Sequence, residues 1–240
     1  MYSRKIQKQI RDLRVPPLPA PPRVPVLLSD SKGLRLQNQI SGSPASYIRF
    51  WCQSGADSAN RLQYLRDNLA HELQTLGNIT LYVWVGTCDL TDKQGNFISL
   101  AAQDNTRVNQ LTTNLREIYH FTRQFGDSVK LVFLHLPVYS IYHWNLAHNY
   151  QGNTEQFKND DYKLNLQVSD VNFFIEDTNR LLHANTPKFS LDLTKPRSRQ
   201  SSPIVYSLNF KLYSDGVHAT NELATLWLVR LCRLIRDDCY

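Results

Sequence analysis

The chain has 240 residues, of which 42% are hydrophobic and 20% are charged, and its formal net charge is +6. This length suffices for one sizeable hydrophobic core and is short for two full domains. No window approaches 18 uninterrupted apolar residues, so a membrane-spanning helix is not expected. Four cysteines are scattered without C-x-x-C pairs, which argues against a disulfide framework or a zinc site and favours a reducing compartment.

The positive charge is concentrated at the N-terminus. Residues 1–23 carry a net charge of +5, whereas the remaining 217 residues carry +1. Six of the 11 prolines fall between residues 16 and 25, a composition typical of a stiff, extended spacer. Basic arms commonly contact nucleic acid or acidic surfaces, although a solvated linker explains the same composition equally well. The basic residues assigned to a nucleic-acid-binding arm are Arg4, Lys5, Lys8, Arg11 and Arg14.

From residue 24 onward, short apolar runs alternate with helical patterns. The runs are VPVLLSD (24–30), YIRFW (47–51), ITLYVWVG (79–86), VKLVFLHLPV (129–138) and, more weakly, KFSLDL (188–193). Continuous apolar runs are typical of strands that are covered on both faces. The helical patterns between them cover 64–77, 108–126, 171–185 and 221–235. We therefore predict a basic, proline-rich arm over 1–23 and one α/β domain over 24–240. This domain is expected to be a three-layer α/β/α sandwich with a five-stranded parallel sheet in a flavodoxin-like arrangement.

Small polar motifs follow the ends of the predicted strands, where sites of parallel sheets lie. They are Ser29-Asp30-Ser31-Lys32-Gly33, Gln53-Ser54-Gly55-Ala56-Asp57, Gly86-Thr87-Cys88-Asp89 and, before the last helix, Ser214-Asp215-Gly216-Val217-His218. Each motif alone is weak, because a serine after a strand is more often a helix cap than a nucleophile. Their order and spacing along the chain give them weight together.

In these four motifs the sequence resembles the SGNH, or GDSL-type, hydrolase family. The Gly-Asp-Ser block is matched by residues 29–31, with Ser29 in place of glycine, and Gly55 matches the glycine of the second block. The Gly-x-Asn-Asp block is matched by residues 86–89, with Cys88 in place of asparagine. The Asp-x-x-His block is matched without change by Asp215 and His218. The resemblance covers roughly residues 24–236.

The resemblance implies a serine esterase that needs no cofactor or metal. Ser31 would attack an acyl carbonyl, His218 would act as general base and then general acid, and Asp215 would orient the imidazole. The backbone N–H groups of Ser31 and Gly55 would bind the oxyanion. The family's asparagine amide would supply a third donor, and Cys88 stands in its place. A thiol is a weak donor, so this substitution predicts a weakened esterase.

Two alternatives stay open at the level of sequence. The domain could be a degenerate SGNH module that binds a lipid, an acyl group or a partner without turnover. The wording Val-Gly-Thr-x-Asp-Leu also resembles the esterase domains of some retrotransposons, where the arm would contact RNA or DNA. Lys32 and Arg35 either sit on the first helix or face the site and favour anionic substrates. The N-terminus lacks the apolar core of a secretory signal, so we expect an intracellular protein, cytoplasmic or nuclear.

Overall fold

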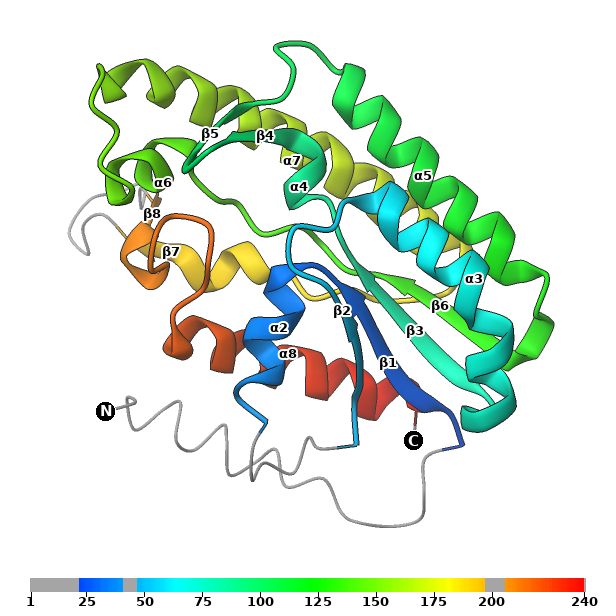
Figure 1. The fold of residues 1–240 in the computed structure, drawn as a ribbon. Helices are drawn as coiled ribbons and strands as arrows, with labels where there is room; N and C mark the ends of the chain where they lie inside the picture. Colours follow the sequence, from blue (N-terminus) through cyan, green and yellow to red (C-terminus); the bar gives the residue numbers. More distant parts are fainter. Residues whose placement is uncertain (1–21, 41–46, 197–205, 240) are drawn as a thin grey trace.

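The computed structural model describes residues 22–40, 47–196 and 206–239 (Figure 1). The basic arm predicted over 1–23 lies outside the described residues except for its last two positions, and so do all five of its assigned basic residues. Of the helices within the described ranges, none combines the length and the apolar composition that a bilayer crossing requires.

The core of the molecule is a parallel sheet of four strands in the order β2-β1-β3-β6. The strands are β1 (Val24–Ser29), β2 (Arg49–Cys52), β3 (Ile79–Trp84) and β6 (Val129–Phe133). Every residue of β3 is buried, as its continuous apolar sequence predicts for an inner strand covered on both faces.

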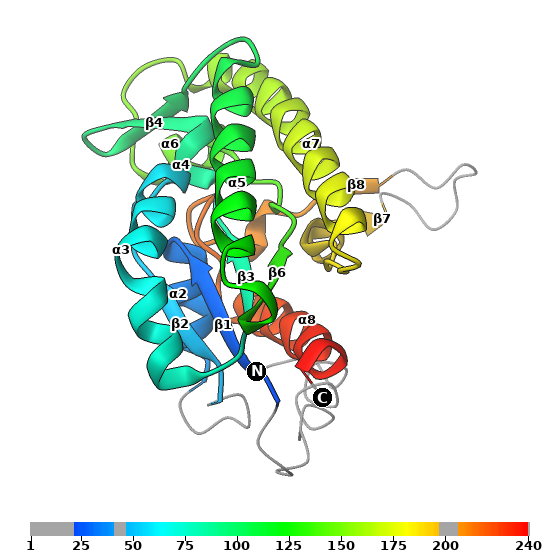
Figure 2. The ribbon, with the colours of Figure 1, turned by 90° about the vertical axis from the view of Figure 1, so that its right-hand side faces the viewer.

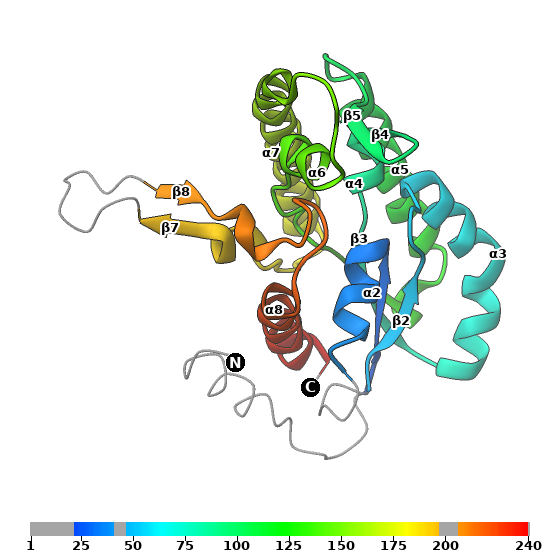
Figure 3. The same cartoon turned by 60° about the vertical axis from the view of Figure 1, so that its left-hand side comes forward.

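Helices cover both faces of the sheet, which confirms the predicted α/β/α layering (Figures 2 and 3). On one face lie α2 (Ser31–Gln37) and α8 (Asn221–Cys239), and on the other lie α3 (Ser58–Leu76) and α5 (Thr106–Arg123). The longest helix, α7 (Phe157–Leu181), packs against α5 and the edge strand β6.

The predicted fifth strand over 188–193 is wrong. Residues Phe189–Leu193 form a 3₁₀-helix, η3. After it, β7 (Thr194–Pro196) pairs antiparallel with β8 (Tyr206–Leu208) in a separate ribbon that projects from the sandwich (Figure 3). Phe189 and Leu193 are buried in the core although they form no strand, and Leu191 between them is exposed. The Phe189 ring packs 4.6 Å from the ring of Trp84.

Side chains of α7, rather than a fifth strand, bond backbone groups at the end of β6 and in the segment that follows it. The Asn179 amide accepts from the N–H of Phe133 at 3.0 Å and donates to its carbonyl at 2.7 Å. Asn172 does the same for Leu136, at 2.7 and 2.9 Å. Buried backbone groups need partners, and two amide side chains supply here what a neighbouring strand would supply.

Shorter elements surround the carboxyl ends of the strands. They are α4 (Thr87–Leu90), the hairpin β4 (Thr91–Gln94) and β5 (Phe97–Leu100), α6 (Ile141–Ala147), and the 3₁₀-helices η2 (Thr154–Gln156) and η4 (Phe210–Leu212). Another 3₁₀-helix, η1 (Gly126–Ser128), directly precedes β6 at the amino end of that strand. The hairpin and α6 lie next to each other above the sheet (Figure 1). Neither was predicted as a regular element, and both contribute to the site.

Candidate active site

Ser31 is the first residue of α2 and follows β1 almost directly. Asp30 caps the helix by accepting the N–H of Lys32 at 2.8 Å. The N–H of Ser31 belongs to the first turn, where backbone donors have no partner within the helix. Gly33 lets the helix lie close to the strand, because a Cβ at this position would be only 2.6 Å from the Cβ of Ser29.

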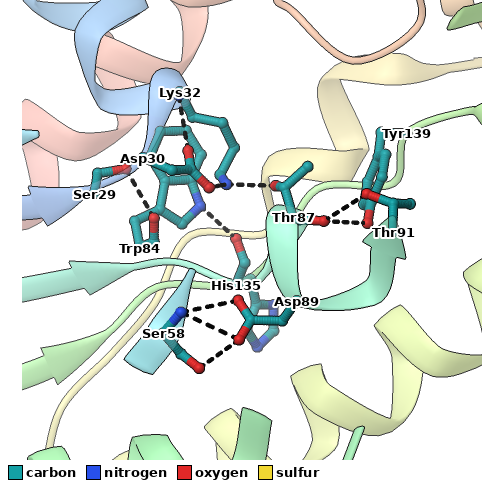
Figure 4. A network of polar contacts seen from close by, with 10 residues as sticks. All are labelled: Ser29, Asp30, Lys32, Ser58, Trp84, Thr87, Asp89, Thr91, His135 and Tyr139. Atoms are coloured by element: carbon teal, nitrogen blue, oxygen red, sulfur yellow. Dashed lines mark hydrogen bonds and ion pairs between the residues drawn. The ribbon is translucent and has the colours of Figure 1, made fainter. Parts of the chain in front are cut away.

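A buried polar network formed by the two neighbours of Ser31 in sequence and by Ser29 joins β1 and α2 to β3 and α4 (Figure 4). Ser29, which replaces the family's glycine, is fully buried and donates its hydroxyl to the Trp84 carbonyl at 2.8 Å. Lys32 forms a buried ion pair with Asp30 and donates to the Thr87 hydroxyl at 2.5 Å. The cation and the carboxylate neutralise each other, so the role of Lys32 is structural: it connects Asp30 and α2 to Thr87 of α4.

The glycines after β2 and β3 shape two more parts of the site. Gly55 has a φ of +74°, and a Cβ placed on it would meet nothing within 4 Å. Gly86 has a φ of +130°, and a Cβ there would lie 2.7 Å from Leu136. The left-handed backbone at Gly86 turns β3 into α4, whose second residue is Cys88. Burial, and next the carboxylate of Asp30, raise the pKa of the Cys88 thiol to about 11, so it is neutral at pH 7.

Asp215 and His218 form a closed hydrogen-bonded unit before α8. The Nδ1–H of His218 faces Asp215 Oδ2 at 2.7 Å. Asp215 Oδ1 accepts the backbone N–H groups of Val217 at 3.0 Å and His218 at 2.7 Å. Burial by itself would raise the pKa of Asp215, but the hydrogen bonds from the His218 ring and from these N–H groups outweigh it and lower the pKa. The carboxylate therefore stays ionised and holds the imidazole with Nε2 available.

The loop that carries this pair is held against α6. Gly216 has a φ of +92°, and a Cβ there would lie 2.6 Å from the Cβ of His143 and 2.9 Å from the N of Trp144. The N–H of Ser140 donates to the Gly216 carbonyl at 3.0 Å. The Trp144 ring lies 5.3 Å from the ring of His218. Only glycine allows this contact, so α6 fixes the position of the histidine.

The predicted serine, histidine, glycine and cysteine line one cavity of about 360 Å³ at the carboxyl ends of the strands. Asp215 is not on its wall and lies behind His218. The hairpin and α6 supply much of the remaining wall, through Thr91, Asp92, Lys93, Ile98 and Trp144. Neither Lys32 nor Arg35 is on this wall, so the sequence-based option that they face the substrate has no structural support.

Sequence reasoning missed the hairpin side of the cavity. A signal was present, because Gly95-Asn96 separates two short runs and such pairs favour a hairpin turn. Gly95 indeed has a φ of +60° at the turn. The aromatic segment that begins at Ile141 forms the helix α6, and its Trp144 is the residue that reaches the cavity.

Asp89 lies on the other side of Cys88, in a second cavity of about 220 Å³ that Cys88 also lines. Its carboxylate accepts the N–H of Ser58, at the start of α3, with both oxygens at 3.1 Å, and it also accepts the Ser58 hydroxyl. Asn114 donates to that hydroxyl at 2.8 Å. Burial raises the pKa of Asp89 to about 6, despite the hydrogen bonds from Ser58 that lower it.

This raised pKa predicts a pH-dependent stability. The folded chain binds the Asp89 proton more tightly than the unfolded chain, so proton binding by Asp89 stabilises the fold. This contribution to stability is fully present below the unfolded pKa near 4 and is lost as pH rises through about 6. Between pH 5 and pH 7.5, the free energy of unfolding of the wild type should fall by about 1.4 kcal/mol relative to Asp89→Asn. Urea unfolding at both pH values measures the difference. The exposed acid variant Asp67→Asn is the control, and an identical pH dependence of wild type and Asp89→Asn would contradict the prediction.

This chain resembles known proteins in its three-dimensional structure but not in its sequence. No protein-family model matches the sequence, and no curated protein sequence resembles it closely enough to count as a match. A proposed acylhydrolase from Bacteroides fragilis superposes with a TM-score of 0.61 and 12% identity, over 98% of this chain and 97% of the other. A GDSL-like lipase from Bacteroides thetaiotaomicron has a TM-score of 0.58 and 12% identity, over 97% and 98%.

A proposed SGNH hydrolase from Slackia heliotrinireducens has a TM-score of 0.54 and 12% identity, over 88% of this chain and 97% of the other. These solved structures are matched along nearly their whole length. At such low identity the likeness establishes the architecture and no activity. The parallel sheet flanked by helices in this chain is therefore the fold of the SGNH and GDSL-type hydrolases.

Proposed function

We propose that this chain hydrolyses carboxylic esters through an acyl-serine intermediate on Ser31. The main support is the Asp215–His218 pair, in which the 2.7 Å contact engages Nδ1 and leaves Nε2 for a nucleophile. His218 and Ser31 line the same cavity, although 187 residues separate them in the sequence. A serine, a histidine and a carboxylate that orients the histidine are the groups that acyl transfer requires.

The proposed reaction has two steps. In the first, Nε2 of His218 takes the proton of the Ser31 hydroxyl as its oxygen attacks the ester carbonyl, and the protonated imidazole then gives that proton to the departing alcohol. In the second, Nε2 of His218 takes a proton from a water that attacks the acyl carbonyl, and it returns this proton to the Ser31 oxygen as the acyl–oxygen bond breaks and the acid leaves. The imidazolium that forms in each step is stabilised by Asp215, whose lowered pKa keeps it ionised.

The negative charge of each tetrahedral intermediate would fall near the N–H groups of Ser31 and Gly55. Both residues line the cavity, and the open space beside Gly55 leaves room for a substrate. Cys88 lines the same wall where the family places an amide donor. A neutral thiol is a weak donor, and loss of one oxyanion donor costs about 10²–10³ in rate. We therefore propose a reduced rather than an absent activity.

Cys88 also supports a second candidate function. With a weak donor at this position, the domain would be a degenerate SGNH module that binds a lipid, an acyl group or a partner without turnover. In that role, as part of a retroelement protein, the basic arm would bring RNA or DNA to the complex. The two candidates differ in whether Ser31 is activated for attack.

A fluorophosphonate probe separates them. Because such probes react with activated serines, we expect covalent labelling of one residue, Ser31, as mapped by peptide mass spectrometry. His218→Ala should slow the labelling strongly, since it removes the base. Unlabelled wild-type protein, together with retained binding of a fatty acid, would favour the binding module instead.

A further inference from the structure

Besides the neutral thiol of Cys88, the described wall of the cavity carries three side chains that hold or can acquire a charge, and two of them already have partners. His218 is paired with Asp215. Asp92 is paired with Arg107, with 3.2 Å between the carboxylate and the guanidinium. The third, Lys93, has no carboxylate partner anywhere in the described ranges of the chain. The cavity therefore presents one uncompensated positive charge.

The ammonium group of Lys93 lies over an aromatic ring of the same wall. Its Nζ is 5.7 Å from the ring centroid of Trp144, a separation at which a cation is attracted to the face of an indole. The Trp144 ring in turn lies 5.3 Å from the ring of His218. The ammonium and the imidazole of His218 therefore both lie beside one indole, close enough for a small ester to reach both.

The part of the wall beneath Lys93 is fixed. Lys93 pairs with Ile98 across the hairpin. The fully buried Asn145 accepts the N–H of Ile98 at 2.9 Å and donates to its carbonyl at 2.7 Å. The indole N–H of Trp144 donates to the carbonyl of Asn96 at 2.8 Å. The hairpin and α6 therefore form one unit. The backbone that carries Lys93 is thus held in a defined position beside the reacting groups.

We propose that the ester substrate of this chain also carries an anionic group, which Lys93 binds while Ile98 and Trp144 contact the apolar part. This inference rests on the proposed esterase function and specifies its substrate class. A compact ammonium suits a carboxylate or another small anion. The internally neutralised Lys32–Asp30 pair does not line the cavity, so among the residues that the structure describes Lys93 supplies the preference.

Two matched pairs of esters test the proposal. The first pair carries its charge on the acyl side, 4-nitrophenyl hydrogen adipate against methyl 4-nitrophenyl adipate. The second carries it on the alcohol side, 4-acetoxybenzoate against 4-acetoxybenzamide. For each pair the ratio of kcat/KM, charged over neutral, is measured for the wild type and variants. We expect the wild-type ratio in at least one pair to exceed that of Lys93→Gln by about fivefold, the size of one exposed charge pair, and to fall with added salt.

The matched control is Lys158→Gln, because Lys158 also lies over an aromatic ring, 5.2 Å from that of Tyr142, but outside the cavity wall. Its ratios should equal those of the wild type. Lys93→Glu should lower the ratio further than Lys93→Gln, since it repels the anion. Equal ratios for wild type and Lys93→Gln in both pairs, with esterase activity present, would overturn the inference and leave the proposed function intact.

A binding measurement keeps the inference testable without turnover. In the Ser31→Ala background, calorimetry compares 4-acetamidobenzoate with 4-acetamidobenzamide, which are stable amide analogues of the second pair. Tighter binding of the charged analogue that is lost in Ser31→Ala/Lys93→Gln supports the anion site. Equal affinities in both backgrounds, with no charge preference in the ester pairs, refute it. Absent labelling of Ser31 by the fluorophosphonate would count against the esterase alone.

Discussion

Replacing Ser31 with alanine is expected to lower kcat/KM for a short-chain ester by about 10⁴–10⁶-fold, the range seen when a member of a catalytic triad is removed. The hydroxyl is the atom that forms the acyl-enzyme, and nothing in the proposed mechanism substitutes for it. Hydrolysis of 4-nitrophenyl acetate, followed as nitrophenolate release, measures the effect. The decrease should appear in kcat rather than in KM, because the Ser31 oxygen takes part in the reaction but contributes little to the binding of the neutral ester.

The control is a second serine on the same wall. Ser54 also lines the cavity but belongs to the loop after β2, and the proposed mechanism gives its hydroxyl no role. Ser54→Ala should change the rate by less than about tenfold. The double variant Ser31→Ala/His218→Ala should be no slower than Ser31→Ala alone, because members of a triad act as a unit. Full activity in Ser31→Ala would mean that another group is the nucleophile.

Much of the fold follows from local patterns in the sequence. β3 could be predicted because a continuous, mostly apolar run is typical of a strand covered on both faces, and all six of its residues are buried. The segment 188–193 misled for a physical reason, because its alternating Phe189, Leu191 and Leu193 imitate a strand. Whether such a segment pairs depends on the edge it would join. Here Asn179 already satisfies that edge, and no local pattern reveals an amide on a helix acting as a strand substitute.

The candidate site divides in the same way. The contact between Asp215 and His218 is what the resemblance of their Asp-x-x-His block to the SGNH family implies, and their roles remain predictions until the variants are measured. The hairpin side of the cavity wall could not be predicted from the sequence, because Lys93 and Trp144 come together only when the hairpin packs on α6. Ser29 was read as a deviation from a family glycine, whereas its hydroxyl has a structural partner on β3.

Cys88→Asn is expected to raise kcat/KM for a short-chain ester by up to about 10²-fold, the contribution of one oxyanion donor. Cys88 lies on α4 and lines the same cavity as Ser31 and Gly55. An amide N–H donates a hydrogen bond far better than a neutral thiol, and the pKa of this thiol, about 11, leaves it neutral. The cavity of about 360 Å³ that Cys88 shares with Ser31 provides space for a larger side chain.

Three companion variants make this result interpretable. Ser31→Ala should remove the activity of both the wild type and Cys88→Asn, because the nucleophile acts before any oxyanion can form. Cys88→Ser introduces a better donor of similar size, so a smaller gain than that of Cys88→Asn supports a missing donor. If Cys88→Asn is slower than the wild type while Cys88→Ser keeps the rate, the cavity is built around a small side chain at this position. Cys88 would then serve to pack the cavity wall. The cause of a weak oxyanion site would instead lie at Gly55.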